Sequence, residues 1–185
     1  MALVQQDLVP GTGDHLITLD TDTNLEWLSL NATANLSYLD VLGGAGGYTT
    51  SYGFRYATIP ELMALWNHAG ITRIGGPDMT DPNGNSAGID KLIKLMGGAT
   101  TYPDTNTIQT QGIITALPAP GHPALGRLWF FIKNPADSYA DTDILPTTPP
   151  GGTPENTRNP EVASYLVRDH AFFAPPAPPS NLRVG

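Results

Sequence analysis

Apolar residues recur at every third or fourth position between residues 58 and 70, and this is the strongest structural signal in the chain. The spacing i, i+3, i+4, i+7 is made by Leu62, Leu65, Trp66 and Ala69. Thr58 and Glu61 have the spacing of a capping box, and Gly70 follows the last apolar position. The pattern predicts a helix that buries one face in a core.

Weaker patterns predict further short elements. A helix is expected from the Ser37 cap to Leu42, and another over about residues 86–96, where one face is apolar. Strands are predicted at residues 15–20, 24–30, 112–117, 126–133 and 162–169. The chain is therefore expected to join short strands and helices by long loops.

These elements suggest one domain at residues 14–173, after a polar lead-in at 1–13. Residues 134–160 form a long stretch rich in Pro, Thr, Asp and Asn, which predicts a functional or mobile loop. The proline-rich segment 174–185 favours a linker or a tail. Its last residues resemble the first strand of a fibronectin type III domain.

Composition narrows the classes of function. The 185 residues carry a net charge of −8 with only nine Lys and Arg, which argues against a nucleic-acid partner and is compatible with cation binding. The absence of cysteine excludes disulfides, zinc–thiolate sites and thiol catalysis. No apolar run is long enough to predict a transmembrane helix. No signal peptide is visible at Met1–Val4.

Four short motifs resemble those of the C-type-lectin-like domains of exported bacterial proteins, related to the Lcl C-terminal domain family. They are TNLEWL at 23–28, SYLDV at 37–41, GFRYATIPEL at 53–62 and LVR at 166–168. A similar variant occurs in secreted proteins that carry a PEP-CTERM sorting tail. The resemblance spans about residues 14–170. Asn24 stands where the family has glycine, and Phe54 where it has tryptophan.

The resemblance implies an α+β, C-type-lectin-like fold with short antiparallel strands, two or three helices and long loops. It implies that the strands near residues 25–30 and 162–169 lie close together. It also implies an extracellular or cell-surface location. Arg55, beside a helix start, is expected to hold loop carbonyls or a carboxylate such as Glu26.

No catalytic constellation appears, so the chain is predicted not to be an enzyme. The four histidines are scattered, with no metal-binding spacing, and His68 is expected on the solvated face of its helix. No nucleophile elbow, phosphate-binding loop or dinucleotide-binding glycine pattern occurs.

Calcium is the one cofactor that the sequence offers, through oxygen-bearing side chains in the loop after the long helix and at the start of the next helix. The candidate ligands are Asp78, Asp81, Asn83, Asn85 and Asp90. Ordinary turn and capping roles for these residues are the favoured alternative. The Asp20–Asn24 stretch also alternates oxygen ligands, but there the favoured interpretation is a turn between strands.

Tyrosines expected in loops offer a second kind of site, because aromatic rings stack on the faces of sugars. These candidates are Tyr48, Tyr52, Tyr102 and Tyr139, and ordinary surface packing explains them as well. The sequence thus predicts a non-enzymatic domain that binds a glycan or a protein partner through its loops. The alternative is a structural subunit of a filament or surface layer, whose terminal tails contact copies of itself.

Overall fold

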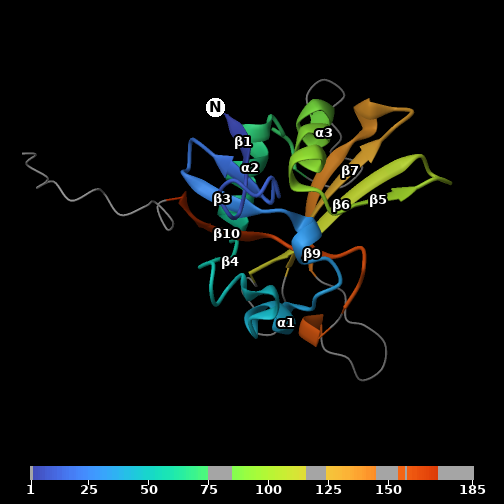
Figure 1. Cartoon of the computed structure of the whole chain (residues 1–185). Coiled ribbons are helices and arrows are strands. Elements are labelled where there is room, and N and C mark those ends of the chain that lie inside the picture. The colour runs from blue at the N-terminus through green and yellow to red at the C-terminus, as the bar shows by residue number, and fades with distance from the viewer. Residues whose placement is uncertain (1, 75–84, 116–123, 145–153, 157, 171–185) are drawn as a thin grey trace, which may run out of the picture.

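The computed structural model describes residues 2–74, 85–115, 124–144, 154–156 and 158–170. Within them the chain has an α+β architecture of two sheets and three α-helices. In Figure 1, sheet A (β1-β2-β3-β10-β4) lies on the left and sheet B (β5-β6-β7-β8, with β9) on the right, with helix α3 between them. The broad fold class predicted from the sequence is therefore confirmed.

Sheet A is antiparallel, and the two ends of the described chain meet in it. Its strands, in spatial order, are β1 (Leu3–Gln6), β2 (Ile17–Asp20), β3 (Leu25–Leu28), β10 (Leu166–Asp169) and β4 (Arg55–Tyr56). Trp27 of β3 lies opposite Val167 of β10, which confirms the predicted closeness of these strands. The segment 1–13, expected to be a lead-in, instead contributes β1, because its backbone pairs with β2 over four residues.

Sheet B includes two strands that the sequence did not predict, at residues 99–102 and 139–144. Its strands are β5 (Ala99–Tyr102), β6 (Thr107–Ile114), β7 (Ala124–Phe131), β8 (Tyr139–Ile144) and β9 (Ala163–Ser164). All neighbours are antiparallel except β9, which pairs with β6 in parallel. The expectation of a loop across 134–160 was wrong for the residues of that stretch that the structure describes, which include β8 and the 3-10 helices Pro135–Asp137 and Pro154–Asn156.

The helices α1 (Tyr38–Leu42), α2 (Ile59–Ala69) and α3 (Asn85–Met96) lie where the sequence predicted them. Complete capping boxes start α1 at Ser37 and α2 at Thr58. Gly70 ends α2 with φ of 100°, a left-handed conformation that suits glycine. Leu62, Leu65 and Trp66 are fully buried, as their spacing predicts.

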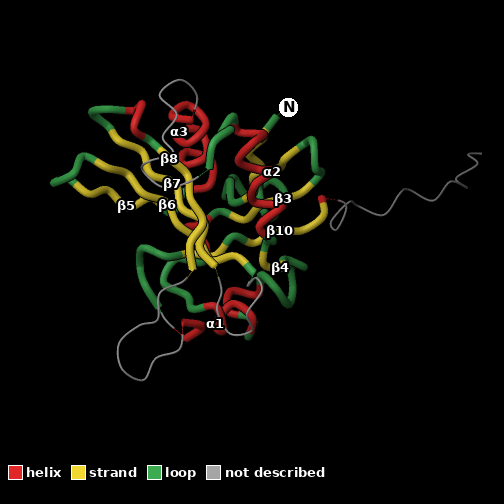
Figure 2. Tube along the Cα trace, turned by 180° about the vertical axis from the view of Figure 1, so that it is seen from behind, coloured by secondary structure: helices red, strands yellow, loops and turns green. Residues whose placement is uncertain are grey.

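The core joins the two sheets through α2 and α3. One cluster includes Trp27 of sheet A, Trp66 of α2, Leu92 of α3 and Leu128 of sheet B. A Cβ on Gly126 of β7 would lie 2.4 Å from Leu62, so this glycine lets helix α2 approach the sheet closely. Figure 2, the view from behind, shows β5 to β8 side by side.

Candidate functional site

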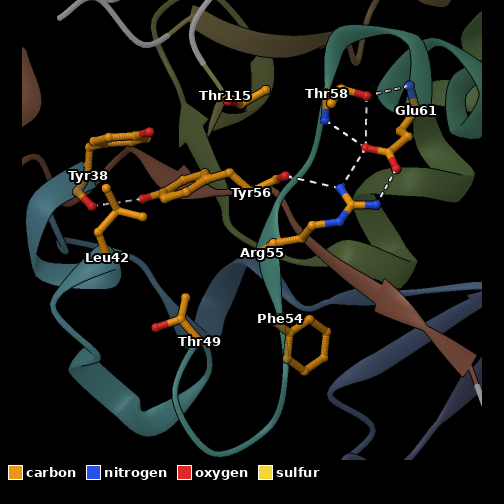
Figure 3. Close-up of a pocket in the computed structure, with 9 residues that line it drawn as sticks. All are labelled: Tyr38, Leu42, Thr49, Phe54, Arg55, Tyr56, Thr58, Glu61 and Thr115. Carbon is orange, nitrogen blue, oxygen red and sulfur yellow. Dashed lines mark hydrogen bonds and ion pairs between the residues drawn. The ribbon is translucent and has the colours of Figure 1, made fainter. Parts of the chain in front are cut away.

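A pocket of about 570 Å³ opens beside α1 and the start of α2. The described residues that line it are Tyr38, Leu42, Thr49, Phe54, Arg55, Tyr56, Thr58, Glu61 and Thr115. Figure 3 shows the tyrosines and Leu42 on one side and the Arg55–Glu61 pair on the other. The wall therefore combines apolar rings, hydroxyl groups and one ion pair.

The capping box of α2 builds the charged side of the pocket. Glu61 folds back so that its Oε2 accepts a hydrogen bond from the Thr58 backbone N–H at 2.8 Å. Arg55 donates to both oxygens of the same carboxylate, at 2.9 and 2.5 Å. These bonds, above all those from Arg55, hold the pKa of Glu61 at about 2, below its usual 4.5. Glu61 is therefore an ionised acceptor near neutral pH.

Two stacked tyrosines build the opposite side. The rings of Tyr38 and Tyr56 have centroids 4.5 Å apart. The hydroxyl of Tyr56 lies 3.1 Å from the Ser164 hydroxyl and donates to the Tyr38 carbonyl at 3.3 Å (Figure 3). Burial raises the pKa of Tyr56, so the phenol stays neutral. Both partners of the Tyr56 hydroxyl lie on regular elements, Tyr38 on α1 and Ser164 on β9, so these contacts fix the position of the ring.

Glu26, Arg168 and His170 form an ion cluster that contacts the loop ending at Phe54. Arg168 of β10 donates to Glu26 of β3 at 2.6 Å and to the Tyr52 carbonyl at 2.9 Å, and its guanidinium lies 4.5 Å from the Phe54 ring. His170 contacts the second Glu26 oxygen at 2.5 Å. Arg55 holds a carboxylate and a backbone carbonyl, as expected, but the carboxylate is Glu61 and not Glu26. Strand register instead places Arg168 opposite Glu26.

Two of the four candidate tyrosines lie in the loop that precedes this cluster. Tyr48 and Tyr52 are half-buried, with ring centroids 6.3 Å apart, and both pack against a core cluster that contains Phe54. They flank Thr49, which lines the pocket, but neither ring lines it. The structure thus places them next to the pocket as packing residues of its loop.

The other two candidate tyrosines lie on strands, so the expectation that they lie in loops was wrong. Tyr102 ends β5 and Tyr139 begins β8, and both stack on Trp129 of β7, with centroids 6.5 and 5.8 Å apart. Phe131 lies 6.2 Å from Tyr139. Burial and a 2.7 Å hydrogen bond to Glu161 raise the pKa of Tyr102 to about 12. Trp129 and Phe131 were not predicted as site residues, although they alternate along one strand.

The candidate calcium ligands that the structure describes have other partners. Asn85 is fully buried and bonds the backbone of Thr72 and Arg73, while Asp90 pairs with Lys94 at 2.6 Å. Asp78, Asp81 and Asn83 lie outside the described residues. In the described part of the chain, no group of three or more His, Asp or Glu side chains has the arrangement of a metal site.

His68 differs from its predicted solvated position. Its Nδ1 lies 2.7 Å from the carboxylate of Asp20, and the side chain is only 18% exposed. Asp20 is buried at the end of β2, so the pair ties helix α2 to sheet A. The first residue of the Asp20–Asn24 turn therefore has a structural role.

None of the described helices combines the length and apolar character needed to cross a membrane. No protein-family model, characterised protein or solved structure matches the sequence significantly. We therefore infer the function from the geometry of the sites themselves.

Proposed function

We propose that this chain is a non-enzymatic binding domain that takes a neutral saccharide unit in the pocket beside α1 and α2. The observation that carries the proposal is the lining of the pocket, which has a volume of about 570 Å³. Tyr38 and Tyr56 lie on one side of it, and hydroxyl groups and the Arg55–Glu61 ion pair lie on the other. That volume falls within the range of small-molecule sites, about 300–1,000 Å³.

Sugars suit such a lining because a pyranose has apolar C–H faces and a rim of hydroxyl groups. Leu42, Phe54 and the two tyrosines supply apolar contact. Three threonines also line the pocket: Thr49, Thr58 and Thr115. The hydroxyls of Thr49 and Thr58 already donate to the Val41 carbonyl and to Glu61, so toward a sugar they act as acceptors. Glu61 accepts and Arg55 donates, and each is already oriented by the other, so little side-chain freedom is lost on binding.

The same contacts argue for binding rather than proton transfer. A general acid or base works best when its pKa lies near the working pH. Arg55 and the Thr58 N–H hold the pKa of Glu61 far below that range, so its carboxylate stays ionised, and burial raises the pKa of Tyr56, so its phenol stays protonated. These two titratable groups of the pocket are thus suited to fixed hydrogen bonds.

The fold and the location are part of the proposal. We infer a C-type-lectin-like domain exported to the cell surface or the extracellular space, from the four motifs and from two structural features they share. The pairing of β3 with β10 brings TNLEWL beside LVR, and the capping box fixes the GFRYATIPEL segment at the pocket.

The test compares two leucines of helix α1. Leu42 lines the pocket and is 50% exposed, whereas Leu39 is 44% exposed and does not line it. A panel of neutral mono- and disaccharides is screened by saturation-transfer NMR, and hits are measured by calorimetry. Leu42→Asp should weaken binding at least tenfold, and Leu39→Asp should leave it unchanged. A blank panel, or equal loss in both variants, would refute the pocket.

A further inference from the structure

Four aromatic side chains form a continuous row on one face of sheet B. Tyr102 stacks on Trp129 with ring planes 28° apart, and Trp129 stacks on Tyr139 with planes 26° apart. Phe131 completes the row at 35° to Tyr139. Strand register places these residues on a shared face, because Trp129 lies opposite Tyr139, and Phe131 and Tyr102 both lie opposite Thr107.

The row is the outer layer of this part of the sheet. Tyr102, Trp129 and Phe131 are each partly exposed, whereas Tyr139 is buried beside them, as are Thr107 and Gln109 on the same face of the strand between β5 and β7. The opposite face packs into the core, where Leu128 and Ala140 belong to the cluster around Trp66. Antiparallel sheets commonly bury one face and present the other, and here the presented face is aromatic.

Polar groups continue the same face beyond the rings. Arg127 and Asp141 lie opposite each other, two residues along their strands from Trp129 and Tyr139, and form two hydrogen bonds at 2.9 and 3.0 Å. At the other side, Glu161 accepts from the Tyr102 hydroxyl. The Trp129 indole N–H is buried and has no acceptor among the described residues, an uncommon state for a buried donor.

We propose that this aromatic row is a second binding surface, for an uncharged β-linked glycan chain. The partly exposed rings lie on β5 and β7, on either side of β6, and strands about 4.8 Å apart give this span the width of about two sugar units. The rings contact the C–H faces of successive sugars, and the Arg127–Asp141 pair and Glu161 contact their hydroxyl groups. The flanking carboxylates and the net charge of −8 disfavour anionic polymers.

The surface has a built-in spectroscopic reporter. The chain contains three tryptophans, of which Trp27 and Trp66 are fully buried, so Trp129 is the one that reaches the surface. The full chain is titrated with cellohexaose, xylohexaose, laminarihexaose and N-acetylated chitohexaose, and acrylamide quenching of tryptophan emission is followed. At least one of these chains should protect Trp129 from acrylamide, and calorimetry then gives its affinity.

Variants locate the binding. Tyr102→Ala, on an edge strand, and Trp129→Ala should each weaken binding at least tenfold, and Trp129→Phe should weaken it less because a ring remains. Ile132→Ala changes an exposed side chain just beyond β7 and should have no effect. Urea unfolding of every variant checks that the fold is intact.

The outcomes separate this surface from the pocket. Loss of binding in the row variants with full binding in Leu42→Asp supports the row, whatever the fate of the pocket. The proposal is overturned if none of the four chains protects Trp129 at millimolar concentration. It is also overturned if Leu42→Asp alone abolishes binding, or if only a charged oligosaccharide or a proline-rich peptide gives protection.

Discussion

Glu61 combines two roles in one carboxylate, since it closes the capping box of α2 and orients Arg55 at the pocket. The cap is local in sequence and was predictable from the spacing of Thr58 and Glu61. The Arg55 contact was not, because nothing in the sequence chooses between Glu26 and Glu61 as its partner. That choice is made by strand register, which gives Glu26 to Arg168.

The depressed pKa of Glu61 leads to a pH prediction. A carboxyl whose pKa falls from 4.5 to about 2 on folding stabilises the fold above pH 4.5, and this stabilisation is lost as the pH falls toward 2. Arg55→Gln removes the largest cause, so the Glu61 pKa should rise toward 4.5 and the loss should begin at higher pH. Carboxyl-carbon NMR titration measures it, and an unchanged Glu61 pKa in the variant would contradict the assignment.

At the scale of elements, helices were easier to predict than strands. Each cap of α1 and α2, and each apolar face of α2 and α3, is formed by residues a few positions apart in the sequence, so a local pattern is enough to predict the helix. Strands β5 and β8 have the sequences ATTY and YADTDI, which lack a clear apolar alternation. Their neighbours β6 and β7 supply the pairing, and β7 alone pairs with β8 over six residues. The aromatic row was not predicted either, because its members come from three strands and only the pairing of those strands brings them together.

Asn85 joins two elements and provides a prediction at this scale. Its side chain accepts from the Thr72 N–H at 3.0 Å and donates to the Arg73 carbonyl at 2.7 Å, so it fixes the segment after α2 to the first residue of α3. Asn85→Ala removes the hydrogen bonds of a buried side chain and should cost about 1–3 kcal/mol of unfolding free energy.

The Asn85 measurement also tests the calcium hypothesis. Urea unfolding of the parent and the variant is compared with and without millimolar calcium, and Asp104→Asn, which changes an exposed carboxylate outside the candidate ligand set, is the matched control. A structural role for Asn85 gives the same loss in both conditions. A loss that appears only with calcium would assign Asn85 to a metal site instead.

At the scale of the whole molecule, the N-terminal segment bears on how the chain associates. The assembly hypothesis assigned residues 1–13 to contacts between copies, but Leu3–Gln6 pairs with β2 of its own chain. A binding domain is therefore expected to be monomeric, and light scattering after size exclusion should give 19.6 kDa at tens of micromolar. Growth of the mass with concentration would favour the assembly subunit.

The segment from β9 to β10 has a consequence for how the molecule forms. Ser164 pairs with Ile113 in sheet B, and three residues later Val167 pairs with Trp27 and Arg55 in sheet A. The same late segment therefore completes both sheets: β9 pairs with Ile113, about fifty residues earlier, and β10 pairs with strands more than a hundred residues earlier in the chain. Such long-range pairing slows folding. During synthesis, sheet A keeps a gap between β3 and β4 until residues 166–169 have emerged, so the nascent chain exposes two unpaired strand edges until then.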